Sequence, residues 1–137
     1  MTLEQYRIKH SQIIECFQWI EFNLKRIYAK LSGKSLLKTI SVLDKENLGS
    51  LIVLVKQTEL QNNTCYLSDE DYELLDQIRE MRNYWCHQCY LDVLFRKDEK
   101  KNLVVRNQDF ANKLTLELYK VEELHYKFQD VYFNIRK

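Results

Sequence analysis

The chain has 137 residues, of which 45% are hydrophobic and 30% charged, and its formal net charge is +1. These values fit one globular domain and exclude a disordered chain, and the near-neutral charge does not mark the molecule as a whole as a nucleic-acid binder. No apolar run approaches the roughly 18 to 20 residues of a membrane span. The first ten residues lack the apolar core of a signal peptide, so we expect a cytoplasmic protein.

Helix breakers are scarce, because the chain contains no proline and only two glycines, Gly33 and Gly49. Long helices are therefore expected. Thr2 and Gln5 form a capping box that predicts a first helix of about 30 residues, which Gly33 ends. The next region, residues 34–60, is predicted to be helical with an interruption near 44–49 and a short helix near residue 38.

The apolar run SLIVLV, residues 50–55, is β-branched enough to resemble a strand. We predict a helix there because no second strand is evident to pair with it. Residues 61–66 are predicted to be a loop, and Ser68 caps the next helix. A charged connection over 96–102 leads to a last helix from Gln108 to about Phe133.

Together these elements predict a single all-α domain over residues 1–137. We expect an up-and-down helical bundle of four main helices plus a short extra helix. The apolar positions of the third long helix are spaced four, three, four and four residues apart, which is typical of a core stripe. They are Leu74, Ile78, Met81, Trp85 and Cys89.

The four cysteines are expected to be free thiols in a reducing compartment. Cys86 and Cys89 form a C-x-x-C with His87 between them, a pattern that raises the question of zinc. A structural zinc site needs about four ligands, and no second pair of suitable spacing exists in the chain. We therefore predict no metal site and no cofactor.

Charge is unevenly distributed, because residues 22–43 contain five basic residues and no acid. Such a stretch can attract phosphate, and it makes Lys30 and Lys34 candidate RNA contacts. The alternative is an ordinary solvated basic face. His10 and His125 are interpreted as surface histidines of helices, since no partner pattern surrounds them.

A polar group lies opposite the core stripe on the third long helix. With Arg82 at 0° on a helical wheel, Arg79 falls at about 60°, Asn83 at about 100° and His87 at about 140°. Arg82 and His87 are thus predicted to diverge, so a single copy does not bring them to one point.

The segment LSDEDYELLDQIREMRNYWCHQCYLDVL resembles the signature helix of HEPN domains, which are small helical bundles found mostly in prokaryotic toxins and defence ribonucleases. The family's pattern is an arginine followed by a polar residue, and a histidine after an interval of four to six residues. Arg82, Asn83 and His87 match it. The resemblance implies a homodimer in which two such helices face each other across a two-fold axis.

The resemblance further implies a metal-independent endoribonuclease of the toxin or phage-defence type, in which the RNA 2′-hydroxyl attacks the adjacent phosphate. His87 would act as general acid or base and Arg82 would stabilise the transition state. Asn83 would orient the phosphate or a catalytic side chain, and Arg79 would contact the RNA backbone. The implied partners are a second copy, an RNA substrate and a possible antitoxin protein.

One departure from the family concerns the antitoxin. Many such toxins carry, two residues after the histidine, a tyrosine that the antitoxin modifies, whereas this chain has Cys89 there. The resemblance therefore leaves open a different antitoxin or none. Two other interpretations of the motif stay open. The chain can be a non-catalytic helical module that binds RNA, a nucleotide or a protein partner, or a plain dimeric helical scaffold whose motif is coincidental. Arg82 by itself can be an ordinary interface ion-pair partner for an acid such as Glu80 of the facing helix.

Overall fold

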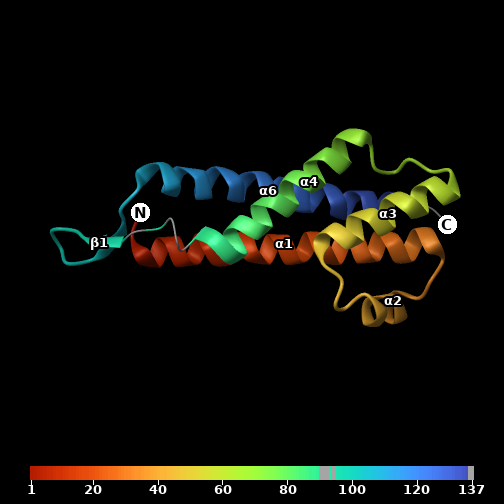
Figure 1. The fold of residues 1–137 in the computed structure, drawn as a ribbon, viewed down its shortest axis with the longest axis horizontal. Helices are drawn as coiled ribbons and strands as arrows, with labels where there is room; N and C mark the ends of the chain where they lie inside the picture. The colour runs from red at the N-terminus through yellow and green to blue at the C-terminus, as the bar shows by residue number, and fades with distance from the viewer. Residues whose placement is uncertain (90–92, 94, 136–137) are drawn as a thin grey trace.

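The computed structural model describes residues 1–89, 93 and 95–135 and is mostly helical, as predicted (Figure 1). The elements in chain order are α1 (Leu3–Ser32), α2 (Leu36–Val42), α3 (Leu48–Asn62), α4 (Asp69–Asn83), the π-helical turn η1 (Tyr84–Gln88), β1 (Phe95–Lys97), β2 (Leu103–Val105) and α6 (Gln108–Asn134). No helix in the described part of the chain is long and apolar enough to cross a membrane.

The predicted ends of the first helix are confirmed, whereas α3 extends to Asn62, two residues into the predicted loop. Thr2 and Gln5 form the capping box of α1, and Gly33 ends the helix in the left-handed region at φ 69°. The run predicted to be helical despite its β-branched residues lies in α3, where the Asn47 side chain accepts a hydrogen bond from the Ser50 amide at 2.8 Å. Capping and burial thus decide the conformation of this run.

The two-stranded hairpin was not predicted, and it contains the whole segment 96–102 that was interpreted as a charged connection. β1 and β2 pair antiparallel, with Phe95 opposite Val105. Val105 also donates its amide to the Met1 carbonyl at 2.8 Å. Strands of three residues carry little sequence signal, and this pairing to the amino terminus depends on contacts far apart in the chain.

The direction of the helices differs from the up-and-down bundle. The ring centroids of Tyr6 and Phe110 lie 5.9 Å apart, and Lys30 Nζ donates to the Tyr132 carbonyl at 3.1 Å, so α1 and α6 run parallel (Figure 1). At the ends of α3 and α1, Asn62 Nδ2 donates to the Leu31 carbonyl at 2.6 Å.

Helices α1, α3 and α6 therefore share one direction, and α4 runs against them (Figure 1). The up-and-down prediction is wrong because the segment between α1 and α3, which includes α2, carries the chain back along α1 before α3 begins. The short helix was expected to be a mere addition to an alternating bundle. Instead, because the segment that contains it returns along α1, α3 runs in the same direction as α1.

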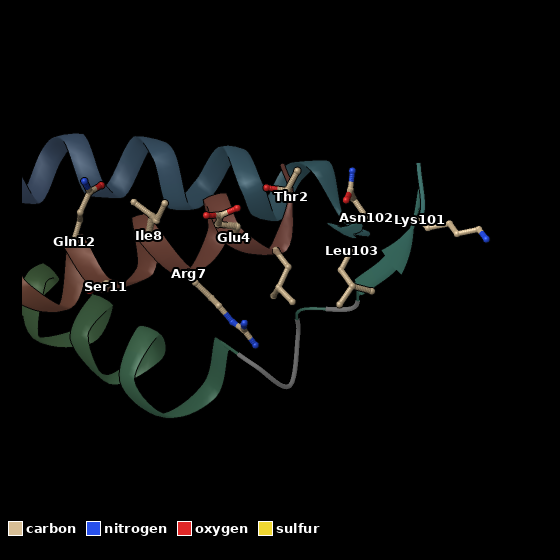
Figure 2. A pocket seen from close by; sticks show the side chains of 10 residues that line it. Thr2, Glu4, Arg7, Ile8, Ser11, Gln12, Lys101, Asn102 and Leu103 are labelled. Atoms are coloured by element: carbon tan, nitrogen blue, oxygen red, sulfur yellow. The ribbon is translucent and has the colours of Figure 1, made fainter. Parts of the chain in front are cut away.

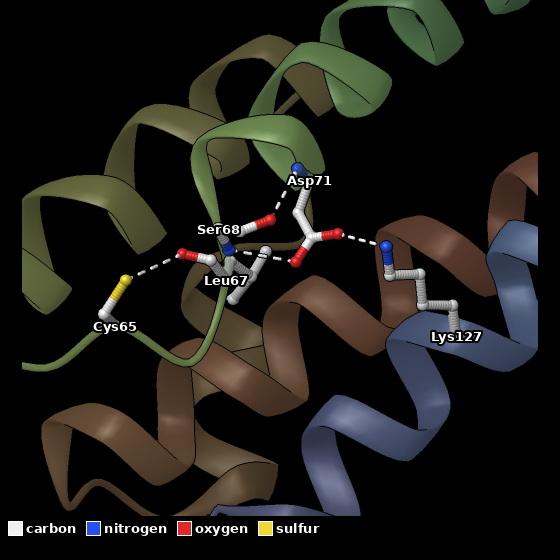
Figure 3. A network of polar contacts seen from close by, with 5 residues as sticks. All are labelled: Cys65, Leu67, Ser68, Asp71 and Lys127. Atoms are coloured by element: carbon white, nitrogen blue, oxygen red, sulfur yellow. Dashed lines mark hydrogen bonds and ion pairs between the residues drawn. The ribbon is translucent and has the colours of Figure 1, made fainter.

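The start of α4 is fixed by a polar network (Figure 3). Ser68 and Asp71 form a capping box, with the Asp71 amide donating to Ser68 Oγ at 3.1 Å and the Ser68 amide donating to Asp71 Oδ2 at 2.9 Å. Asp71 also forms an ion pair with Lys127 of α6. One carboxylate thus caps α4 and joins it to α6.

A buried carboxylate holds the loop before α4. Glu59 is 4% exposed, and its Oε1 accepts hydrogen bonds from the amides of Tyr66 at 2.6 Å and Leu67 at 3.2 Å. The Tyr72 hydroxyl donates to its other oxygen. Burial raises the pKa of Tyr72, and the hydrogen bond to Glu59 raises it further. The loop therefore takes its shape from a residue on α3.

Candidate functional site

The helix that carries the predicted site changes its winding between Arg82 and His87. In η1 the Cys89 amide donates to the Tyr84 carbonyl, five residues back, instead of four as in an α-helix. Because a π turn holds an extra residue, each residue advances by less than the usual 100°. Arg82 and His87 are therefore separated by less than the predicted angle of about 140°.

The π turn is anchored from α1. His10 Nε2 lies 2.8 Å from the Trp85 carbonyl oxygen, and because a carbonyl only accepts, Nε2 carries the proton in this contact. The Trp85 indole is fully buried and donates to Glu117 Oε2 at 2.8 Å. The interpretation of His10 as a surface histidine is wrong, since it holds the helix that carries His87.

Arg82 is paired within its own chain. Its Nε lies 2.7 Å from Glu21 Oε1 on α1, and the side chains are 30% and 17% exposed. The Arg82 guanidinium thus lies against α1 with part of its surface open to solvent. Glu21 holds it in place and also neutralises much of its charge.

The other two predicted catalytic residues are exposed on the same helical unit. Asn83 is the last residue of α4, and His87 lies in η1. Cys86, between them, is exposed as a residue. The partial burial of its thiol raises the pKa of Cys86, while the nearby Arg82 charge opposes the shift. Arg82, Asn83 and His87 therefore belong to one continuous element, as the sequence predicted.

The predicted RNA contacts Arg79, Lys30 and Lys34 each have other partners. Arg79 pairs with Asp76 at 3.8 Å and packs against α3, where a Cβ added at Gly49 would lie 3.3 Å from Arg79 Cδ. Lys30 is nine residues beyond Glu21 on α1, about 14 Å along the axis. Lys34 donates to the Tyr28 hydroxyl at 3.2 Å. The structure therefore places the two lysines at the far end of α1.

His125 was also misassigned as a surface residue. Its Nδ1 lies 3.4 Å from Nδ2 of Asn23, a residue that is only 1% exposed. Burial lowers the pKa of His125, and the charges of Glu15 and Glu122 oppose that shift. No periodicity in the sequence could reveal this contact, because the two residues are 102 positions apart.

The C-x-x-C does not form a converging pair of ligands. Cys89 is 1% exposed, and its Sγ donates to the Trp85 carbonyl at 3.2 Å, whereas Cys86 is exposed. Cys89 Sγ also lies 3.6 Å from His10 Nε2. Among the residues that the structure describes, no group of three or more His, Cys, Asp or Glu side chains is arranged to hold a metal ion.

A separate hollow of about 850 Å³ lies between the first turns of α1 and the hairpin. Figure 2 shows that Glu4 and Arg7 of α1 and Lys101 of the hairpin point in different directions there. They do not converge on a common point. This hollow is an open surface depression and offers no arrangement for catalysis.

Comparison with known proteins gave one family match. Residues 69–106, less than a third of the chain, match the model of a zinc-finger family, zf-C2HCIx2C. No HEPN family was detected, so the resemblance to HEPN domains is wrong. No curated protein and no solved structure matches the chain.

The matched segment contains Cys86, His87 and Cys89, but the geometry does not fit a structural zinc ion. Such an ion needs four ligands in a tetrahedron, and here one thiol is buried on the core side of the helix while the other faces solvent. The match to a zinc-finger family is therefore a similarity of sequence over this segment. The described residues supply no zinc site to go with it.

Proposed function

We propose that this protein cleaves RNA without a metal ion, at a site formed by Arg82, Asn83 and His87. The observation that supports this proposal best is the π turn, which leaves His87 exposed and brings it closer in angle to Arg82. The partly exposed Arg82 guanidinium, held by Glu21, supplies a cation on the same helical unit. Extra residues in helices often occur at functional sites.

The proposed chemistry is attack of an RNA 2′-hydroxyl on the adjacent phosphorus. A base takes the hydroxyl proton, the bond from phosphorus to the 5′-oxygen breaks, and an acid protonates the leaving oxygen. The products are a 2′,3′-cyclic phosphate and a 5′-hydroxyl. Histidine suits either proton transfer near neutral pH, and an arginine fork matches the charge and shape of the phosphorane.

This reaction needs both an acid and a base, whereas one copy of the site offers one histidine. We propose that a second copy supplies the other in a homodimer, because a two-fold interface presents the same patch twice. The toxin or defence role and the antitoxin partner rested on the HEPN resemblance alone. They fall with it.

A second candidate is a non-catalytic module that binds RNA. The ion pair between Arg82 and Glu21 favours it, because a cation already paired at 2.7 Å has less charge to offer a transition state. In this alternative, His87 is an exposed helix residue without a proton-transfer role.

The test is RNA cleavage in excess EDTA by the wild-type protein and the variant His87→Ala. Gln88→Ala is the matched control, because Gln88 is exposed on the same turn. We expect products ending in 2′,3′-cyclic phosphate from the wild type and the control, and a loss of about 10²- to 10⁴-fold in the variant. Equal cleavage by all three proteins, or none by the wild type, would contradict catalysis at His87.

A further inference from the structure

Aromatic side chains gather along one side of α1 and α6, away from the core. Trp19 is 44% exposed and Tyr126 is 63% exposed, and His125 lies between them, with ring centroids 5.8 Å from Trp19 and 4.7 Å from Tyr126. Phe133, which is 60% exposed, continues this face toward the carboxyl end of α6, and its ring centroid is 5.2 Å from that of Tyr132, which packs partly against the core. Exposed aromatic clusters of this kind mark binding surfaces.

A hollow of about 220 Å³ opens in this face. It is lined by Trp19, Asn23, Arg26, His125 and Gln129. Pockets for drug-sized ligands measure about 300 to 1,000 Å³. This one therefore has room for a single flat ring and not for a whole cofactor.

The polar side chains of the hollow form only long hydrogen bonds with one another. Asn23 Nδ2 is 3.4 Å from both Nδ1 and the carbonyl oxygen of His125, and Arg26 Nη1 donates to Asn23 Oδ1 at 3.3 Å. Hydrogen bonds of this type are usually about 2.9 to 3.0 Å long. A buried amide with long contacts gains from a ligand that brings its own donors and acceptors, and the edge of a nucleobase does so.

Charge divides the face into two ends. Arg26 lies 3.8 Å from the centroid of the Tyr132 ring, and Lys30 lies 4.5 Å from it, so two cations flank the hollow on one side. On the other side Glu15 Oε1 accepts the Trp19 indole N–H at 3.4 Å, and the Glu122 charge acts on His125. Phosphates are attracted to the first end and repelled from the second.

We propose that this hollow binds one unpaired base of single-stranded RNA, stacked on Trp19, with the neighbouring phosphates on Arg26 and Lys30. Stacking on aromatic side chains beside a positive track is the usual mode of single-strand binding. Asn23 and Gln129 contact the edge of the base. An unpaired base is required, because the hollow has no room for a base pair.

The strand is RNA rather than single-stranded DNA because the protein is proposed to cleave RNA. This part of the inference rests on the proposed function. The two sites lie on different sides of α1. Glu21, which holds Arg82, is two residues from Trp19 and is turned by about 200° from it. The hollow is therefore a separate contact for the substrate, outside the cleavage site.

The experiment measures the affinity for a decauridylate that is 2′-O-methylated throughout, and therefore lacks the attacking hydroxyl. Fluorescence anisotropy of an end-labelled oligomer gives Kd, and quenching of Trp19 reports stacking, because Trp85 is fully buried. We expect Trp19→Ala to weaken binding by about 5- to 100-fold, and Trp19→Phe to restore most of it. Tyr66→Ala removes an aromatic side chain exposed elsewhere and should leave Kd unchanged.

Equal affinity in the wild type and Trp19→Ala would overturn the proposal, and so would the absence of binding by the wild type. Loss of affinity in Lys30→Ala without any loss in Trp19→Ala would indicate attraction by charge alone and would also overturn it. Binding through Trp19 without RNA cleavage would contradict the proposed function alone, and cleavage without binding through Trp19 would contradict this inference alone.

Discussion

Arg82 Nε lies 2.7 Å from Glu21 Oε1, which makes an ion pair between α4 and α1 with both side chains mostly shielded from solvent. Arg82, the cation of the proposed site, is therefore already paired with a carboxylate. Its availability to an RNA phosphate depends on how strongly Glu21 holds it. The strength of this pair bears on both candidate functions.

A double-mutant cycle with Arg82→Gln and Glu21→Gln should give a coupling of about 1 kcal/mol in the free energy of unfolding. The reason is the short distance and partial burial, which reduce screening by water. Urea denaturation of the four proteins measures it. The control is the pair of Arg79 and Asp76, which is 3.8 Å apart and 43% and 67% exposed, and should show almost no coupling. Similar couplings in the two cycles would contradict the prediction.

Replacing Glu59 by glutamine should lower the free energy of unfolding by about 1.5 to 3 kcal/mol. The carboxylate accepts two loop amides and the Tyr72 hydroxyl, and a neutral amide cannot replace all three charge-assisted bonds. Urea denaturation gives the difference. Glu73→Gln, at an exposed position of α4, serves as the control and should be nearly neutral. An equal loss of unfolding free energy in the two variants would show that the hydrogen bonds of Glu59 do not stabilise the loop.

The contribution of Asp71 to stability should disappear in acid. Burial raises the pKa of Asp71, but the hydrogen bond and charge of Lys127 and the bonds to Ser68 outweigh it, so the pKa falls below its ordinary 3.8. Because the folded-state pKa is the lower one, the stabilisation is complete above 3.8 and is lost as the pH falls through the folded value.

The stability difference between the wild type and Asp71→Asn should therefore be largest at neutral pH and should shrink below pH 3.8. Thermal unfolding of the two proteins over a series of pH values measures it. Asp69→Asn, at an exposed position of the same first turn, controls for the general effect of charge near a helix start. A difference that stays constant with pH would rule out the ionised carboxylate as the cause.

Chelation should leave the fold intact. The described helices are held by an apolar core that includes Phe17, Trp85 and Phe128, and the C-x-x-C thiols do not converge. Tm and helical circular dichroism should therefore be unchanged by excess EDTA, and Cys86→Ser should behave as the wild type does. A cooperative loss of helix on chelation would mean that zinc is needed for folding.

The sequence by itself determined the helices and their ends. Capping residues such as Thr2 and Ser68 act on amides three positions away, and glycine at position 33 tolerates a left-handed backbone wherever the helix packs. The placement of Arg82, Asn83 and His87 on one helical unit also followed from the sequence, because it depends only on helical periodicity. These features are local, so residues close in the chain are enough to predict them.

Only the tertiary structure decided the direction of α3, the π turn and the hollow beside His125. The π turn is anchored by His10, which is 75 positions from Trp85, and Asn23 contacts His125 across 102 positions. The hairpin strands pair with each other and with the amino terminus through backbone groups that every sequence carries. Contacts of this kind depend on which helices pack together, and that is settled by the shape of the whole core rather than by any one segment.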